Sequence, residues 1–201
     1  MRDTLIVGIG SPHGSDRAGW LAAELLQSHI ATLALAYRCS CRIAQVPHQL
    51  LDWLQGQETA HLIDACYAPH ERLQRYRLDV TPAEVRLTRQ ALPGEALHEQ
   101  SVPHTAELLS QLHSASTHHL PLPAVLQLAQ QLNLLPRHVT LWTIPIAAQG
   151  FAQRESQTLA EPGVLPDTIA ELPADVQQAI DQCVRCLVSE CGDRAHLSPP
   201  T

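Results

Sequence analysis

Two aspartates and one histidine, far apart along the chain, are the residues whose side chains first suggest chemistry: Asp16, Asp64 and His118. Two carboxylates and an imidazole form an oxygen, oxygen and nitrogen ligand set that suits a divalent metal such as nickel or zinc. Each aspartate also has an ordinary structural interpretation, Asp16 as the cap of a helix and Asp64 as the cap of a turn after a strand. Whether the three can act together depends on the elements that carry them.

The sequence around these residues alternates between strand and helix patterns. Short β-branched and leucine-rich runs predict strands, and runs rich in Ala, Leu and Glu or with apolar residues at helical spacing predict helices. The predicted strands are residues 4–9, 42–46, 60–64, 75–80 and 139–144, and the predicted helices are residues 17–30, 47–55, 122–132 and 174–190. This alternation is typical of a parallel sheet. Two polar, proline-containing stretches, 81–115 and 150–172, are expected to be excursions from the sheet.

The fold class that follows is α/β, a single-domain three-layer α/β/α sandwich with a mostly parallel twisted sheet. We expect this domain to cover residues 1–192 and to be followed by a disordered tail over residues 193–201. In such sheets, ligands bind beyond the carboxyl ends of the strands. Asp16 follows the first predicted strand and Asp64 ends the third, so both should emerge at this edge. His118 precedes the helix predicted at 122–132 and is expected at the same edge.

A glycine-rich loop after the first strand admits a second interpretation, a dinucleotide site, because Gly8-x-Gly10 follows a strand and precedes a helix. The third glycine of that fingerprint should lie at position 13. His13 stands there, and its side chain would obstruct the close approach of helix and strand that the fingerprint serves. A nucleophile-elbow hydrolase is also disfavoured, because Ser11 follows Gly10 directly, without the intervening residue of G-x-S-x-G.

The cysteines and histidines raise the alternative of a dedicated zinc protein. Cys183 and Cys186 form a C-x-x-C, but Cys183 falls on the same helical stripe as Val176, Ile180 and Leu187, and no second C-x-x-C follows. The 12 histidines are scattered, and no H-E-x-x-H occurs among them. Core packing is therefore the preferred interpretation of this pair, and the six cysteines are expected to be thiols.

Composition restricts the partners. The chain has 201 residues and a formal charge of −7, with no cluster of basic residues, so nucleic acid is not expected to bind. No stretch approaches the roughly 18 apolar residues that a membrane helix needs, and the first residues lack the charged and apolar regions of a signal peptide. We therefore expect a protein of the cytoplasm that does not bind membranes.

Four segments resemble motifs of one known family. Residues 8–20 read Gly-Ile-Gly-Ser-Pro-His-Gly-Ser-Asp-Arg-Ala-Gly-Trp and resemble the G-x-G-N-P-x-x-G-D-D-x-x-G opening of hydrogenase-maturation endopeptidases. The segments 50–54 (Leu-Leu-Asp-Trp-Leu), 61–65 (His-Leu-Ile-Asp-Ala) and 116–120 (Ser-Thr-His-His-Leu) look like the L-L-D-x-L, I-D-A and S-S-H-G-L segments of the same family. The resemblance covers residues 4–145, and the order and spacing of the motifs carry it.

The resemblance implies a function and a site. In such proteins the second aspartate of the opening motif, the aspartate of I-D-A and the histidine of S-S-H contact a metal, and these positions carry over to Asp16, Asp64 and His118. The family is classed with aspartic-type endopeptidases and removes a C-terminal extension from the large subunit of nickel-iron hydrogenase after nickel insertion. It thus implies that Asp16 and Asp64 are catalytic, that nickel is contacted in the precursor, and that a monomer binds the precursor without a permanent cofactor.

The chain also departs from the family pattern. Ser15 replaces the first aspartate of the opening pair in a loop that is one residue shorter, and the G-x-x-P-G that often follows the I-D-A aspartate is missing. His119 replaces a common glycine and is either an extra ligand or a solvated loop residue. These departures keep open an alternative function, a non-catalytic protein that binds the hydrogenase precursor as a chaperone would. The sequence also leaves open whether cleavage is metal-assisted or of the aspartic type.

Overall fold

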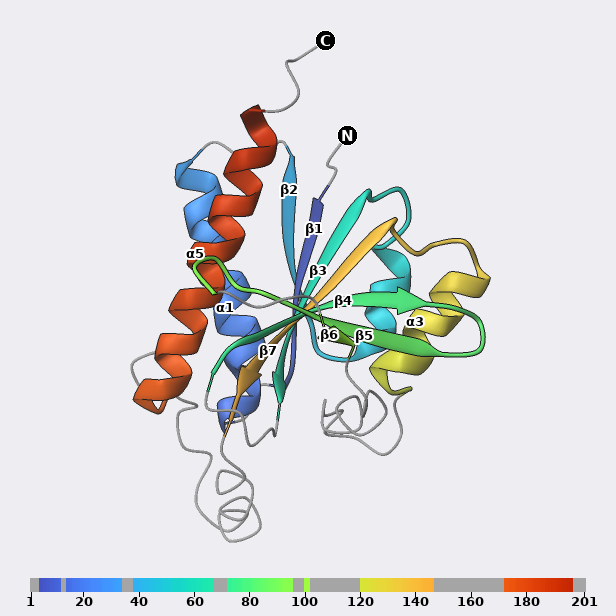
Figure 1. Ribbon diagram of the computed structural model, residues 1–201, viewed down its shortest axis with the longest axis horizontal. Coiled ribbons are helices and arrows are strands. Elements are labelled where there is room, and N and C mark those ends of the chain that lie inside the picture. The colour runs from blue at the N-terminus through green and yellow to red at the C-terminus, as the bar shows by residue number, and fades with distance from the viewer. Residues whose placement is uncertain are drawn as a thin grey trace, which may run out of the picture.

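The computed structural model describes residues 4–11, 14–33, 38–66, 72–95, 100–101, 120–146 and 172–196. These residues form a seven-stranded sheet in the order β2-β1-β3-β7-β4-β5-β6 with helices on both faces (Figure 1). The strands are β1 (Thr4–Ile9), β2 (Cys39–Ala44), β3 (Thr59–Cys66), β4 (Gln74–Val80), β5 (Val85–Gln90), β6 (Gln100–Ser101) and β7 (His138–Pro145). The helices are η1 (Gly14–Arg17), α1 (Ala18–Thr32), η2 (Pro47–Asp52), α3 (Leu122–Gln131) and α5 (Ala174–His196), where η denotes a 3₁₀ helix.

The sheet has a parallel and an antiparallel half. Strands β2, β1, β3 and β7 pair in parallel, whereas β4, β5 and β6 continue the sheet from β7 in antiparallel pairs. Every residue of β1 and β3 is buried, as expected for parallel strands covered by helices on both faces. The parallel arrangement predicted from the βαβαβ alternation thus describes the half of the sheet that carries Asp16 and Asp64.

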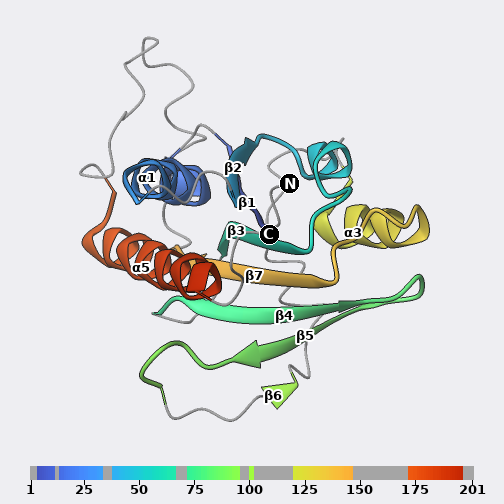
Figure 2. The ribbon, with the colours of Figure 1, turned by 90° about the horizontal axis from the view of Figure 1, so that it is seen from above.

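Helices cover the two faces and complete three layers (Figure 2). On one face α1 and α5 pack over a core that includes Ile6, Ile63, Trp142 and Ile180. On the opposite face η2 and α3 enclose a second core, whose members include Leu5, Val7, Leu50, Leu62, Val125 and Leu141. Alternate residues of β1 and β3 contribute to different cores because successive side chains of a strand point to opposite faces. The α/β/α sandwich predicted from the sequence is confirmed.

Three predictions about the elements need correction. Residues 81–115 are not wholly an excursion, because β5 lies within them and pairs with β4 across a turn in which the Thr81 hydroxyl accepts a hydrogen bond from the Glu84 amide at 3.1 Å. Residues 47–55 contain the short 3₁₀ helix η2 and no α-helix. Finally, α5 continues past Gly192 to His196. The predicted tail boundary is thus four residues too early, and residues 197–201 lie outside the described part.

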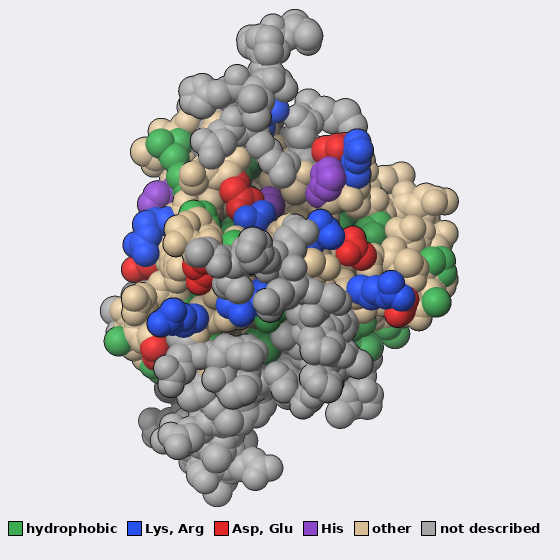
Figure 3. Space-filling view, in the orientation of Figure 1, with side chains coloured by type: hydrophobic (Ala, Val, Ile, Leu, Met, Phe, Trp, Pro, Cys, Tyr) green, Lys and Arg blue, Asp and Glu red, His purple; other side chains and the backbone are tan. Residues whose placement is uncertain are grey.

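Two surface properties bear on the partners of the chain. Arginine and acidic side chains are interspersed over the face shown in Figure 3, with no broad area of one sign. Within the described residues, no helix combines the length and the apolar character needed to cross a lipid bilayer.

Candidate functional site

Asp16 and Asp64 are both buried at the carboxyl end of the parallel strands. Asp16 lies in η1, directly after β1, and is 2% exposed; Asp64 lies near the end of β3 and is also 2% exposed. Among the described residues, neither oxygen of Asp16 nor the Oδ1 of Asp64 has a hydrogen-bond partner. The backbone amide of Ala65 donates a hydrogen bond to the Asp64 carboxylate. A buried carboxylate oxygen without a partner is costly, and a carboxylate that only capped a helix or turn would be hydrogen-bonded, so these two aspartates form the candidate site.

Glycines bring the loop of Asp16 against the sheet. A Cβ atom added at Gly10 would lie 2.2 Å from the backbone oxygen of Asp16, and one added at Gly8 would lie 2.2 Å from the backbone oxygen of Gly19. A Cβ at Gly19 would in turn meet the carbonyl oxygens of Ile9 and Ile63, at 2.4 and 2.6 Å. The glycines of the opening motif therefore let η1 and α1 approach the ends of β1 and β3, which accounts for them without a nucleotide.

The electrostatics couple the two aspartates. Burial raises the pKa of Asp64 well above its usual value, and the nearby charge of Asp16 raises this pKa further. Two charges of the same sign in a buried site are relieved by a shared proton or by a cation. The donor set therefore fits a divalent cation chemically, because Asp16 and Asp64 offer carboxylate oxygens to which no described residue donates a hydrogen bond.

Removing the charge of Asp64 should stabilise the fold. Because the pKa of Asp64 is raised in the folded state, the folded protein holds this proton more tightly than the unfolded chain. The contribution of Asp64 to stability is therefore most favourable below the unfolded pKa of about 3.9 and is lost as the pH rises toward the folded pKa. We expect Asp64→Asn to raise the free energy of unfolding at pH 7 by about 1–3 kcal/mol.

Denaturant unfolding of wild type and Asp64→Asn between pH 4 and pH 8 checks this, with Asp52→Asn, at an exposed position, as the control. The difference between Asp64→Asn and wild type should widen as the pH rises. A difference that stays constant or narrows over this range would contradict the assignment.

The third predicted ligand, His118, and its neighbour His119 lie outside the described residues. The first described helix that follows them in the chain is α3. Helix α3 begins at Leu122 and ends at Gln131, and only residues 132–137 link it to the start of β7. The end of α3 must therefore lie near the amino edge of the sheet, and its first turn faces the carboxyl edge (Figure 1). Among the described residues alone, no three side chains form a group able to hold a metal ion.

Two residues that were not predicted as part of the site, Cys66 and Tyr76, lie in the core on the same face of the sheet as Asp64. Cys66 is 1% exposed, and burial, followed by the charge of Asp64, raises its pKa to about 12. Burial also raises the pKa of Tyr76 to about 12, while a hydrogen bond with Thr143 opposes the shift. The two-residue period of a strand puts Cys66 on the face of Asp64, a signal that was present in the sequence. Within the described part of the chain, the Oγ of Ser11 is a further buried oxygen without a hydrogen-bond partner.

The cysteine prediction is confirmed for the C-x-x-C pair. Cys183 and Cys186 of α5 are buried in the core with Val176, Ile180 and Leu187, and burial raises the pKa of both thiols. Within the described part of the chain, all six cysteines are free thiols.

The fold and site together define an α/β/α protein with two buried, unpaired carboxylates at the carboxyl edge of a parallel sheet. Two solved structures share this fold. The hydrogenase maturating endopeptidase HybD from E. coli aligns with a TM-score of 0.55 at 15% identity, covering 96% of this chain and 94% of that chain. The NiFe hydrogenase maturation protease HycI from Thermococcus kodakarensis KOD1 aligns with a TM-score of 0.51 at 16% identity, covering 95% and 92%. The chain therefore has the fold of these proteases over nearly its whole length.

Sequence comparison adds no closer relative. No protein-family model matches the chain, and no curated protein matches its sequence.

Proposed function

We propose that this chain is an endopeptidase that removes the C-terminal extension of a nickel-iron hydrogenase large-subunit precursor after nickel insertion. The observation that carries the proposal is the pair Asp16 and Asp64, buried at one edge of the sheet with three carboxylate oxygens unpartnered. The fold that the chain shares with HybD and HycI supports this proposal. In this proposal His118 completes the set that contacts the nickel held by the precursor. The protein acts in the cytoplasm as a monomer and holds no metal of its own.

The chemistry required is hydrolysis of one peptide bond. Water adds to the carbonyl carbon, the C–N bond breaks, and the products are a new carboxylate and a new amine. Precursor nickel near the scissile bond would polarise the carbonyl and lower the pKa of a bound water to about 7. One of the two aspartates would accept the proton of the water and return it to the leaving amine.

An aspartic-type variant of this mechanism uses the same residues. Two carboxylates that share one proton activate water without help from a metal. The effect of Asp16 on the pKa of Asp64 supports such coupling. In that case nickel serves for recognition, and the proton shared by Asp16 and Asp64 serves for catalysis.

A second candidate function is a chaperone-like protein that binds the precursor without cutting it. The observation that favours it is Ser15, which stands where the resembling proteases have the first aspartate of a pair. Both functions predict a complex with the precursor, and they differ in whether its mass changes.

Incubation of the purified chain with nickel-loaded and nickel-free precursor tests the proposal. We expect mass spectrometry to show a shortened large subunit and a released C-terminal peptide only with the nickel-loaded form. Metal analysis of the purified chain should find well under one equivalent of metal. A complex in which the loaded precursor stays intact would support the chaperone-like function, and equal cleavage of both forms would refute the nickel requirement.

A further inference from the structure

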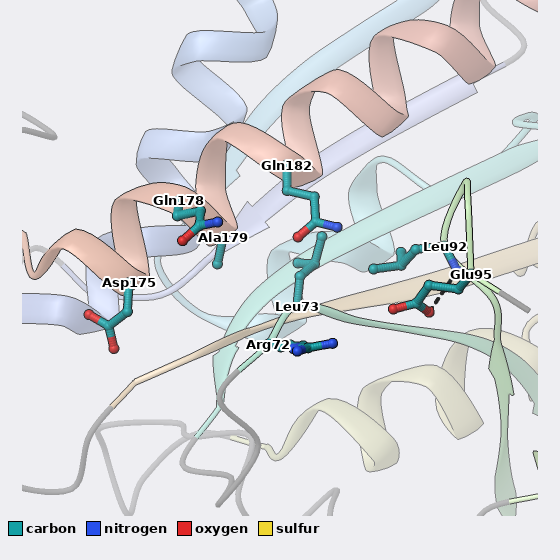
Figure 4. Close-up of a pocket in the computed structure, with 8 residues that line it drawn as sticks. All are labelled: Arg72, Leu73, Leu92, Glu95, Asp175, Gln178, Ala179 and Gln182. Atoms are coloured by element: carbon teal, nitrogen blue, oxygen red, sulfur yellow. Dashed lines mark hydrogen bonds between the residues drawn. The ribbon is translucent and has the colours of Figure 1, made fainter. Parts of the chain in front are cut away.

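A polar groove runs along α5 on the face of the sheet that α5 covers. Its first part is a cavity of about 430 Å³ between α5 and the segments that flank β4 and β5 (Figure 4). A second hollow of about 420 Å³ adjoins it and shares two of its lining residues, Gln178 and Gln182. The residues of α5 that line the cavity and the adjoining hollow run from Asp175 to Ser189, a length of roughly 21 Å at 1.5 Å per residue. The groove is thus long enough for about six residues of extended chain.

The walls of the groove offer polar groups that the chain itself leaves free. Gln178 and Gln182 lie one turn apart on α5, and within the described residues neither carboxamide is hydrogen-bonded. Arg72 lies across the groove from them and makes no ion pair with a described residue. Each carboxamide can donate to a carbonyl and accept from an amide, which are the groups that an extended peptide backbone presents.

The floor and one end of the groove are fixed by the fold. Leu73 and Leu92 form an apolar floor beneath α5 and belong to the buried core. At the far side, the backbone amide of Leu92 donates a hydrogen bond of 3.2 Å to the carboxylate of Glu95, and the amide of Glu95 donates one of 2.9 Å to the carbonyl of Leu92. The groove therefore lies between a rigid turn and a helix.

The groove starts close to the candidate site. Asp64 of β3 is paired with Thr143 of β7, and Thr143 is paired with Gln74 of β4. Two strand spacings of about 4.8 Å separate Asp64 from Gln74, so the Cα atoms lie roughly 10 Å apart. Arg72 and Leu73, which line the groove, directly precede Gln74. The groove lies on the α5 face, whereas the side chain of Asp64, like those of Leu62 and Cys66, belongs to the η2 and α3 face. A bound peptide must therefore cross the carboxyl edge of the sheet to reach Asp64, which takes about three to five extended residues.

We propose that this groove binds an extended peptide, the segment of the precursor that adjoins the cleaved bond, through hydrogen bonds from Gln178 and Gln182 to its backbone and through Arg72 to an acidic group. This inference rests on the proposed function for the identity of the peptide. The groove determines how tightly the precursor binds, whereas Asp16 and Asp64 determine whether it is cut.

The test compares wild type with Gln178→Ala/Gln182→Ala and with Arg72→Ala. Fluorescence anisotropy with a labelled synthetic peptide that spans the precursor's cleavage point measures binding separately from cleavage. We expect both variants to raise the Kd about tenfold, because the hydrogen bonds to the peptide are lost. In steady-state processing of nickel-loaded precursor, KM should rise by a similar factor while kcat stays within twofold of wild type.

A matched control is available on the other face of the sheet. Gln127 and Gln131 lie one turn apart on α3, so Gln127→Ala/Gln131→Ala makes the same chemical change away from the groove. Alanine preserves the helix in both double variants, which far-UV circular dichroism verifies. Unchanged Kd and KM in the groove variants would overturn the inference. The inference would also be overturned if the groove variants changed only the sedimentation coefficient, because the groove would then bind a second copy of the chain.

Peptide binding also distinguishes the inference from the function on which it rests. If wild type binds the peptide through Gln178, Gln182 and Arg72 but never cleaves the precursor, the groove stands and the endopeptidase activity fails. If wild type cleaves the precursor and the groove variants do so with unchanged KM, the activity stands and the groove fails.

Discussion

Replacing Asp16 by asparagine is expected to lower the rate of precursor processing about a thousandfold. The substitution keeps the shape of the side chain but removes a charge that can contact a cation or accept a proton, and general-base contributions are typically 10²–10⁴-fold. Asp64→Asn should have an effect of the same order, and so should His118→Ala if the imidazole contacts the nickel. The measurement is the mass of the nickel-loaded precursor over time, at enzyme concentrations high enough to detect residual cleavage.

A control separates this effect from a loss of structure. Asp52→Asn changes an exposed aspartate at the end of η2 and should leave processing unchanged. Asp16→Asn and Asp64→Asn should be folded and at least as stable as wild type, because both replace a buried carboxylate that has unpartnered oxygens. Full processing by Asp16→Asn and Asp64→Asn would eliminate the carboxylates as the catalytic groups.

Replacing Gly19 by alanine is expected to destabilise the fold by about 2–3 kcal/mol. The new Cβ would lie 2.4 Å from the carbonyl oxygen of Ile9 and 2.6 Å from that of Ile63. Both oxygens belong to the strand backbone and cannot move without disturbing β1 and β3, so the clash exceeds the roughly 1 kcal/mol that alanine gains over glycine in a helix. Thermal unfolding should show a melting temperature about 5–10 °C lower.

Gly192→Ala is the matched control for this substitution. Gly192 also lies in a helix, α5, but a Cβ added there meets no atom within 4 Å. The same chemical change should therefore stabilise the protein, by at most about 1 kcal/mol. Equal effects of the two substitutions would show that α1 does not approach the strands as closely as the glycines indicate.

The unpartnered carboxylates explain why the site costs stability. A helix cap or a turn would satisfy the oxygens of Asp16 and Asp64, yet three of these oxygens are buried and have no hydrogen-bond partner in the described part of the chain. Local departures from good hydrogen bonding are expected where a protein meets a ligand rather than where it supports its own fold. The expected gain in stability of Asp64→Asn and its expected loss of processing thus have the same physical origin, the removal of a buried carboxylate charge.

Much of the fold is readable from local patterns. The strand predicted at residues 4–9 has the bounds of β1, and the helix predicted at 122–132 differs from α3 by one residue. Both are long or strongly patterned, so local preference and tertiary packing agree. The antiparallel pairing of β5 was missed because the run Val85–Gln90 is mostly polar outside Val85 and Leu87, and its partner strand supplies the pairing. In the segment expected to be a helix over 47–55, only residues 47–52 are helical, as the 3₁₀ helix η2, whose Pro47 and Leu50 are buried.

The sequence by itself determined the α/β class and the end of the sheet at which Asp16 and Asp64 emerge, because residue type and period encode these locally. Only the tertiary structure decided that the carboxylates are buried without partners, that the charge of Asp16 reaches Asp64, and that Gln178 and Gln182 line a groove whose far wall begins at Arg72. Burial and proximity depend on which segments meet in space, and Gln182 and Arg72 are 110 residues apart in the chain (182 − 72 = 110).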